Sequence, residues 1–226
     1  TYVIGETKST VYPALGANIF QTTNKGNFDA FAAQFDQSYA LKWLTFYGGS
    51  EDDFGISLVY DDYNGDKLYL CGISNSTNPS LLNDAPFASS YQEVSSGFSR
   101  KGLLARLNAN NGSRDWGTFF GGYYTVITGI SNDSFGNIFI TGHTENAFDY
   151  VQSCSGSVGT FPGCNLPGTT DYFKNIHSLS NSSCSVTPFS FFNYDAFIAR
   201  FNNACELTYS SLLGGCDNDQ AYDIVV

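Results

Sequence analysis

The sequence predicts an all-β fold, on three observations. One pattern of short apolar segments recurs three times along the 226 residues, and Gly or Asn stands where strands would turn. No segment has an apolar stripe with the 3.6-residue period of a helix. Each short segment instead places alternate residues on one face, as a β-strand does. The chain is therefore expected to be a repeat of strands.

The first element of each unit is an apolar run that ends in Gly. It occurs as Tyr2–Gly5, Leu68–Gly72 and Ile138–Gly142. Because these runs are short and rich in branched and aromatic residues, we expect a buried strand at each position.

The second element alternates large and small side chains on one face. It lies within Asp29–Phe35, Lys101–Leu107 and Asp195–Phe201. The small residue in the middle of this face is alanine in all three units. A period of two brings the large, small and large side chains to the same face, where the alanine leaves room for a neighbouring sheet. The residues of this face are Phe31, Ala33, Phe35, Leu103, Ala105, Leu107, Phe197, Ala199 and Phe201.

The third element is a strand that ends in a tight Gly-Gly turn. It is seen in Trp43–Gly49, Trp116–Gly122 and Tyr209–Gly215. The fourth is a looser strand, 55–61 in the first unit and 129–133 in the second. It is followed by Asn-Gly or Gly-Asn, which is typical of a hairpin turn.

Four antiparallel strands in units of about 65 to 95 residues predict propeller blades, since radial repetition protects sheet edges. An array of β-sandwiches is the alternative. The chain is then one propeller segment, 1–226, part of a larger propeller. Its divisions are a partial blade at 1–49, a blade at 50–122, a blade at 123–215 with a long insertion at 143–194, and the first strand of a next blade at 216–226.

Residues 221–226 align with 56–60, so the chain is expected to begin and end within a blade. Three units are fewer than the roughly four to eight blades of a closed propeller. We expect the outer sheets to be covered by further blades of the same polypeptide, which we favour, or by other copies in an oligomer or filament.

The repeat resembles the bacterial β-propeller family called SBBP. The likeness is carried by Phe20–Thr23, Gly48–Gly55, Asp133–Gly142 and Asp195–Phe197, and it covers nearly the whole chain. It implies a secreted or surface-attached bacterial propeller, commonly of about seven blades, with no activity of its own. The chain departs from the pattern at 123–126, where the acidic pair is missing, and in the 143–194 insertion.

Composition limits the partners. The chain has 10 Lys and Arg against 21 Asp and Glu, a net charge of −11, and the cations are scattered. Nucleic acid and anionic membrane surfaces are therefore excluded as partners. No apolar run approaches the roughly 20 residues that span a bilayer, so no membrane insertion is expected.

No motif predicts an enzyme. His143 and His177 are the only histidines, and no nucleophile elbow, zinc-protease helix or phosphate loop is present. The acidic pairs at 52–53 and 218–219 and the turn at 61–66 could bind calcium. We favour Asx turns there, because carboxylates beside Gly accept backbone N–H groups and the spacing is not that of a calcium loop. No metal site or other cofactor is expected.

The insertion ends in aromatic residues that are the candidate ligand-binding group: Phe189, Phe191, Phe192 and Tyr194. They could stack on sugar rings or on a protein partner, but we favour a role in anchoring the loop to the sheets. The function that we infer is an extracellular, non-catalytic module for adhesion, scaffolding or surface-structure assembly. The alternative is a domain that binds or hydrolyses surface glycans at the insertion.

Five of the six cysteines lie in the last third of the chain and are disulfide candidates: Cys154, Cys164, Cys184, Cys205 and Cys216. None forms the Cys-x-x-Cys pair of a zinc site, so disulfides in a secreted or surface protein are expected. We pair Cys154 with Cys164 and Cys205 with Cys216, leaving Cys184 unassigned. A fully extended strand between Cys205 and Cys216 would separate their Cα atoms by about 35 Å, so that pair needs a bend, or Cys184 replaces one partner.

Overall fold

The structure is a computed structural model that describes residues 1–10, 15–77, 100–121, 124–145, 194–214 and 218–226. These residues form eleven strands, every pair of which is antiparallel, and the all-β prediction is confirmed. Within the same ranges there is no helix that could cross a membrane.

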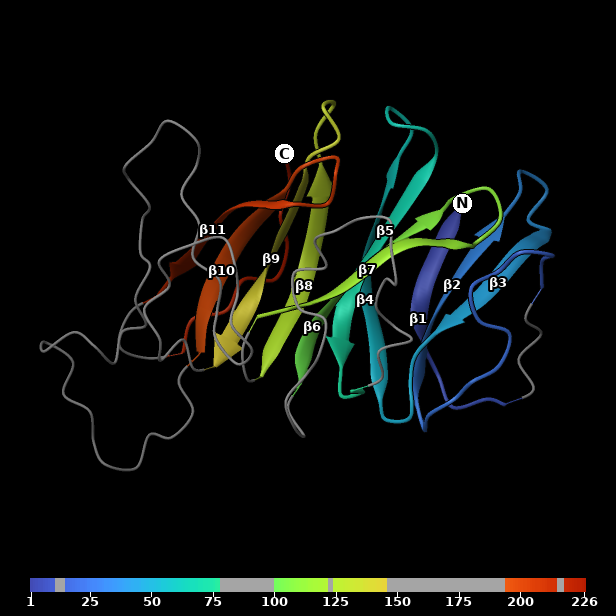
Figure 1. Ribbon diagram of the computed structural model, residues 1–226, viewed down its shortest axis with the longest axis horizontal. Coiled ribbons are helices and arrows are strands. Elements are labelled where there is room, and N and C mark those ends of the chain that lie inside the picture. The colour runs from blue at the N-terminus through green and yellow to red at the C-terminus, as the bar shows by residue number, and fades with distance from the viewer. Residues whose placement is uncertain (11–14, 78–99, 122–123, 146–193, 215–217) are drawn as a thin grey trace, which may run out of the picture.

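The strands form three sheets that follow one another along the chain (Figure 1). Sheet A has the order β1-β2-β3, sheet B the order β4-β5-β6-β7, and sheet C the order β8-β9-β10-β11. Their bounds are β1 Tyr2–Thr7, β2 Asp29–Phe35, β3 Leu41–Tyr47, β4 Asp53–Asp61, β5 Lys67–Ser74, β6 Lys101–Asn108, β7 Arg114–Phe120, β8 Thr125–Asn132, β9 Ile138–Glu145, β10 Tyr194–Phe201 and β11 Leu207–Leu213.

The three sheets pair their strands in the same register. In each, the glycine that ends the apolar run lies opposite the first large residue of the large-small-large face. Gly5 lies opposite Phe31, Gly72 opposite Leu103, and Gly142 opposite Phe197. Strands β1, β5 and β9 are therefore equivalent. The last two each pair with a further strand, β4 or β8, on their other side, whereas β1 lies at the edge of sheet A.

The large-small-large faces of sheets B and C are buried between sheets, as the sequence predicts, whereas that of sheet A lies in a cluster of its own. Leu103, Ala105 and Leu107 of sheet B belong to one core with Trp43 and Tyr47 of sheet A. The next core joins sheets B and C; its largest members are Tyr69, Trp116, Phe120, Phe197 and Phe201. Ala105 and Ala199 are 0% exposed and Ala33 is 1% exposed.

Two tryptophans hold neighbouring sheets against each other. The Trp43 indole N–H donates to the carbonyl of Ala109 at 2.9 Å, and so links β3 to the turn after β6. Trp116 packs edge-on against Phe201 with ring centroids 5.9 Å apart. A tryptophan of sheet A therefore contacts sheet B, and a tryptophan of sheet B contacts sheet C. The order of the sheets follows the order of the repeats.

Candidate functional site

The chain passes from one sheet to the next through the same backbone hydrogen bond each time. In each case a backbone carbonyl at the start of the second element accepts from the amide of the first residue of the next segment, which is β4, β8 or 219–226. The three bonds are Asp53 N to Phe28 O at 2.7 Å, Thr125 N to Arg100 O at 3.2 Å, and Asp219 N to Tyr194 O at 2.7 Å. The third bond leads into residues 219–226, so these residues leave sheet C as β4 leaves sheet A.

A side-chain hydrogen bond also recurs at the first and third of these crossovers. The Asp52 carboxylate accepts the amide N–H of Phe28 at 3.2 Å, and the Asn218 side-chain oxygen accepts that of Tyr194 at 2.9 Å. Asp219 therefore corresponds to Asp53. It follows that residues 219–226 correspond to the first eight residues of β4.

Residues 219–226 lie against β8. The Thr128 hydroxyl donates to the Ala221 carbonyl at 2.7 Å, and a Cβ at Gly129 would lie 2.7 Å from the Cα of Asp223. Glycine at this position lets the two backbones approach. Among the described residues no strand pairs with 219–226. Tyr222, Val225 and Val226 are 75%, 91% and 61% exposed, whereas Ile224 is partly buried.

Strand β1 offers the complementary feature, an open edge. The amine of Thr1 donates to Phe35 O at 3.0 Å and the amide of Phe35 donates back to Thr1 O at 2.8 Å, so Thr1 is a hydrogen-bonded partner of Phe35. Antiparallel pairing alternates, so the backbone groups of the residues between bonded positions turn away from β2. Tyr2, Ile4 and Glu6 therefore direct their N–H and C=O groups to the edge that no described strand covers.

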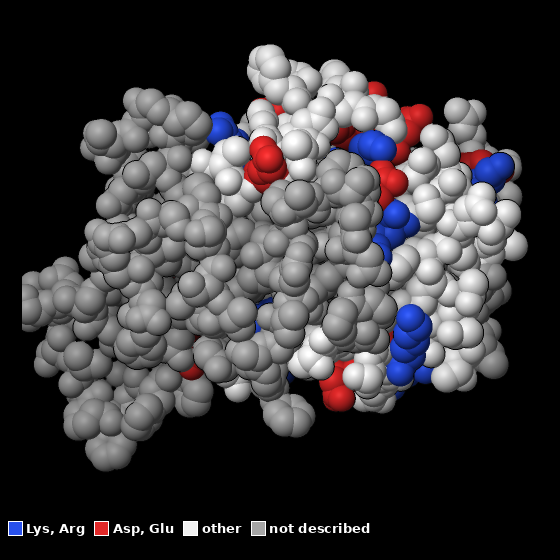
Figure 2. All heavy atoms as spheres, in the orientation of Figure 1, with Lys and Arg blue, Asp and Glu red and all other residues white. Residues whose placement is uncertain are grey.

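The outer face of sheet A also carries the large-small-large pattern. Phe31, Phe35 and Leu41 are partly buried around Ala33, Leu44 and Phe46, in a cluster separate from the two cores between sheets. A shallow hollow of about 410 Å³ lies at the end of this sheet, lined by Thr1, Gln34, Phe35, Asp36, Gln37 and Tyr39. In Figure 2 few charged side chains lie on the visible described surface of sheet A. The second element of sheet A thus has the pattern that sheets B and C bury, without a following sheet of described residues on it.

The acidic pair after the first Gly-Gly turn is structural. The carboxylate of Asp53 accepts the amide of Gly49 and the hydroxyl of Ser76, both at 2.7 Å, and also the hydroxyl of Ser74. Burial raises the pKa of Asp53 to about 6. In sheet C the equivalent position is Thr125, whose hydroxyl bonds that of Thr144 at 2.7 Å. The residue at position 53 therefore ties β4 to β5, and Thr125 ties β8 to β9 in the same way.

The Gly-Gly turn has a steric cause. A Cβ at Gly48 would lie 2.3 Å from the carboxylate carbon of Asp29, and one at Gly214 would lie 1.9 Å from a carboxylate oxygen of Asp195. Asp29 in turn accepts the amides of Lys25 and Gly26 at 2.9 and 3.1 Å. Burial raises the pKa of Asp29 above its ordinary value. The recurring Asp and Gly of the repeat are therefore one packing unit.

The turn at 61–66 has Asx geometry. The carboxylate of Asp61 accepts the amide of Tyr63 at 3.1 Å and the side-chain N–H of Asn64 at 3.0 Å. Asp133 makes the same contact in sheet C, accepting the amide of Phe135 at 2.9 Å. Over the residues that the structure describes, no group of three or more His, Cys, Asp or Glu side chains is placed to hold a metal ion.

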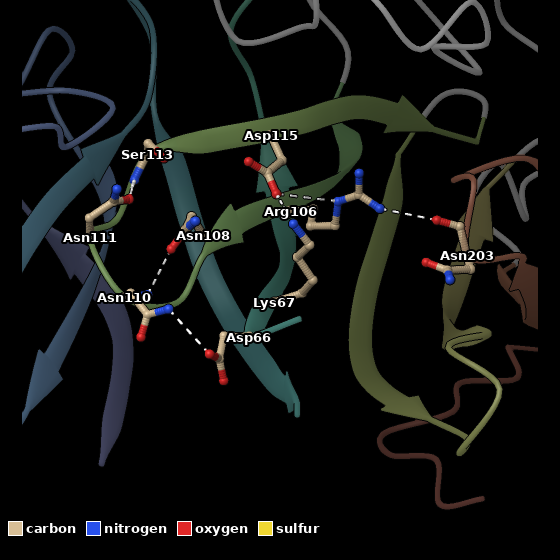
Figure 3. Close-up of polar contacts among 9 residues, drawn as sticks. All are labelled: Asp66, Lys67, Arg106, Asn108, Asn110, Asn111, Ser113, Asp115 and Asn203. Carbon is tan, nitrogen blue, oxygen red and sulfur yellow. Dashed lines mark hydrogen bonds and ion pairs between the residues drawn. The ribbon is translucent and has the colours of Figure 1, made fainter. Parts of the chain in front are cut away.

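A charge cluster joins sheets B and C (Figure 3). Lys67 of β5 contacts the Asp115 carboxylate of β7 at 2.7 Å, and the Arg106 guanidinium of β6 lies 3.8 Å from the same oxygen. Arg106 also donates to the carbonyl of Asn203, in the turn after β10, at 3.1 Å. Arg106 therefore spans the two sheets, because its guanidinium faces Asp115 of sheet B and donates to Asn203 of sheet C.

Sequence reasoning missed this cluster. Arg106 stands between Ala105 and Leu107, where the alternating pattern assigns it to the face of β6 opposite Ala105, and that face packs against sheet C. An arginine only 4% exposed on such a face requires a buried partner. The signal was an arginine flanked by the apolar residues Ala105 and Leu107.

The disulfide prediction gains no support. Cys205 is a free, buried thiol in the turn between β10 and β11, and the described residues contain no disulfide. That turn lies at the end of β11 opposite Gly214, so seven strand residues separate Cys205 from the Gly-Gly turn. Burial raises the pKa of Cys205 to about 11, which keeps the thiol protonated. The candidates Cys154, Cys164, Cys184 and Cys216 lie outside the described residues.

Only one of the candidate ligand-binding aromatics falls in the described residues. Tyr194 begins β10 and meets His143 of β9 edge-on, with ring centroids 5.2 Å apart. Burial lowers the pKa of His143, so the imidazole is neutral at pH 7. Phe189, Phe191, Phe192 and His177 lie outside the described residues, and so does the insertion from 146 to 193.

Comparison with known proteins gives no family. No protein-family model matches the chain, and no curated protein matches it. The resemblance to the SBBP repeat therefore stays a prediction.

Proposed function

We propose that this chain is an extracellular, non-catalytic β-propeller module whose sheets are blades and whose role is adhesion, scaffolding or the assembly of a surface structure. One observation carries the proposal. The same sheet-to-sheet crossover occurs three times, and the third leads into residues 219–226, which no described strand partners. Such an arrangement extends by adding sheets. The added strands come from further blades of the same polypeptide or from other copies.

The polar clusters agree with a structural role. Asp53 is bonded to Gly49, Ser74 and Ser76, and Asp115 to Lys67, so these carboxylates act within the chain. The buried thiol of Cys205 is held protonated by its raised pKa and is a poor nucleophile. Catalysis would need a nucleophile and a base within reach of a substrate.

Two measurements test the proposal. Sedimentation velocity of the 226-residue chain from about 1 to 100 μM is expected to show association that rises with concentration, because among the described residues no strand pairs with the free side of β1 and no other sheet covers the outer face of sheet A. A panel of chromogenic glycosides is expected to remain uncleaved. A monomer at every concentration that binds no hydrophobic dye would contradict assembly, and turnover of a glycoside would contradict the absence of catalysis.

The extracellular location has a separate test. It follows from the repeat resemblance and the cysteine-rich last third of the chain, and it implies disulfides among the cysteines other than the two free ones, Cys71 and Cys205. Non-reducing peptide mapping of the secreted protein is expected to find at least one. Four reduced thiols at 154, 164, 184 and 216 would remove this argument.

A further inference from the structure

We propose that the hairpin turns of sheets B and C bind a neutral glycan chain, with the rings of Tyr63 and Phe135 as the surfaces on which sugar rings stack. The inference rests on the proposed adhesion role and names its ligand class and its site. Each ring stands at the same place in its turn, two residues after the aspartate that accepts its amide, Asp61 or Asp133. The site is separate from the 143–194 insertion.

Both rings project into solvent from a fixed backbone. Tyr63 is 70% exposed and Phe135 is 79% exposed. The Asp61 carboxylate accepts the amide of Tyr63 at 3.1 Å. The Asp133 carboxylate accepts the amides of Phe135 and Asn137, each at 2.9 Å. An aromatic side chain on such a turn has only its two side-chain torsions to lose when a ligand binds, so the entropic cost of binding is small.

The two turns touch, which places the rings on neighbouring tips. A Cβ at Gly136 would lie 2.5 Å from the side-chain nitrogen of Asn64. The Asn203 side chain, in the turn after β10, donates to the side-chain oxygen of Asn64 at 3.4 Å. All these turns project from one end of the molecule, at the top of Figure 1. Because packed sheets lie about 10 Å apart, a ligand that contacts both rings must be longer than a monosaccharide.

Amide side chains accompany the rings. The turns 62–66, 109–113, 133–137 and 202–206 of sheets B and C carry asparagine at positions 64, 110, 111, 137, 202 and 203. Asn110 and Asn203 are exposed, and Figure 3 shows them on opposite sides of the charge cluster. An amide offers two donors and an acceptor, which suits neighbouring hydroxyl groups that both donate and accept.

The combination of aromatic ring and amide points to a sugar. One face of a pyranose ring carries C–H groups that pack on an aromatic ring, and the hydroxyls at its rim need hydrogen-bond partners. The exposed Asp62 precedes Tyr63 and Asp66 closes the same turn, so an anionic glycan would be repelled. Lys67, next in the chain, contacts Asp115 at 2.7 Å. A neutral glycan is therefore favoured.

A protein partner fits this surface less well. A stable protein interface buries about 800 Å² on each partner around an apolar centre. Among the described residues of these turns, Tyr63 and Phe135 are the exposed large apolar side chains, and amides and carboxylates accompany them. Two rings set among polar groups suit a chain of sugars better than a continuous apolar contact.

Affinity electrophoresis tests the site. The 226-residue chain is run in native gels that contain laminarin, glucomannan or hydroxyethyl cellulose, all neutral, or the anionic polygalacturonate. We expect at least one neutral polysaccharide to retard the chain and polygalacturonate to leave its mobility unchanged. Tyr63→Ala and Phe135→Ala are each expected to weaken the retarding interaction at least about tenfold, whereas Phe135→Tyr keeps the ring and the binding.

Tyr39→Ala is the matched control. Tyr39 is 82% exposed in the turn after β2 of sheet A, so its loss removes an exposed ring outside the proposed site and is expected to leave binding unchanged. All four variants change exposed side chains and are expected to melt with the unmodified chain. Equal loss of binding in Tyr39→Ala would overturn the assignment to these turns.

The outcomes separate this inference from the proposed function. Retardation by none of the neutral polysaccharides, or retardation that Tyr63→Ala and Phe135→Ala leave unchanged, would overturn the glycan site and leave the proposed module standing. Self-association that these two variants abolish, without any polysaccharide binding, would assign the rings to a contact between copies and overturn the glycan site. Cleavage of a chromogenic glycoside would instead contradict the non-catalytic function.

Discussion

Ala199 is the most stringent test of how the sheets pack. It lies on β10 between Phe197 and Phe201, opposite Ile140 of β9 and Ser210 of β11, and it is 0% exposed. Phe120 of sheet B stands 5.3 Å from Phe197 and 5.9 Å from Phe201, centroid to centroid. A phenylalanine at 199 has no free space on this face and must push sheets B and C apart or turn its neighbours out of their rotamers.

The expected cost of Ala199→Phe is about 1 to 3 kcal/mol of unfolding free energy, the usual range for overpacking a filled core. At about 2 to 4 °C per kcal/mol for a domain of this size, the melting temperature falls by roughly 2 to 12 °C. Urea unfolding followed by tryptophan fluorescence measures the same loss, because Trp116 lies in this core. The fall is expected without a change in secondary structure by circular dichroism.

Ile198→Phe is the matched control, because Ile198 is the neighbour on the opposite face of β10 and is partly exposed. It is expected to cost less than about 0.5 kcal/mol, as a surface substitution does. If Ala199→Phe melts with the unmodified chain, or if the two variants lose equal stability, the buried large-small-large face between sheets is wrong.

Three further predictions follow from the polar clusters. Burial raises the pKa of Asp53 from 3.8 to about 6, so between these pH values the folded state keeps a proton that the unfolded state has released. The free energy of unfolding therefore falls as pH rises through this window, by up to about 3 kcal/mol. Asp53→Asn is expected to remove that part of the pH dependence, measured as urea midpoints at pH 4 and pH 7. Gly48→Ala and Gly214→Ala each force a Cβ onto the carboxylate of Asp29 or Asp195 and are expected to cost about 1 to 3 kcal/mol in thermal melts; a melting temperature unchanged in both would contradict the packing unit. Cys205, buried and with its pKa raised to about 11, is expected to react with iodoacetamide in the native protein at least about a hundredfold more slowly than in urea; equal rates would show that the thiol is open to solvent.

Much of the fold could be predicted from the sequence because it depends on local periodicity. The Gly-ended runs at 2–5, 68–72 and 138–142 all lie in strands, and the three alanines at the centre of the second element are all buried. Alternation by two fixes which side chains share a face, and repetition fixes that the faces meet in order. The Asx turn at Asp61 was also predictable, since it needs only residues a few positions away.

The remaining features depend on contacts between distant residues. Arg106 finds Asp115 nine positions along the chain but Asn203 almost a hundred positions away, and only the stacking of sheets B and C brings the latter near. Cys205 is buried by the turn after β10, so its composition-based assignment to a disulfide gave no hint of its surroundings. The sequence aligned 221–226 with 56–60, but the equivalence of Asp219 with Asp53 needed the hydrogen bond from the Asp219 amide to the Tyr194 carbonyl.

Hydrogen exchange at single amides tests the central claim, that one crossover joins each sheet to the segment that follows it, most directly. The amides of Asp53, Thr125 and Asp219 donate to the carbonyls of Phe28, Arg100 and Tyr194. All three amides are expected to exchange slowly and to a similar degree, as equivalent crossovers would. An Asp219 amide that exchanges as fast as an unstructured peptide, while those of Asp53 and Thr125 are protected, would contradict the account.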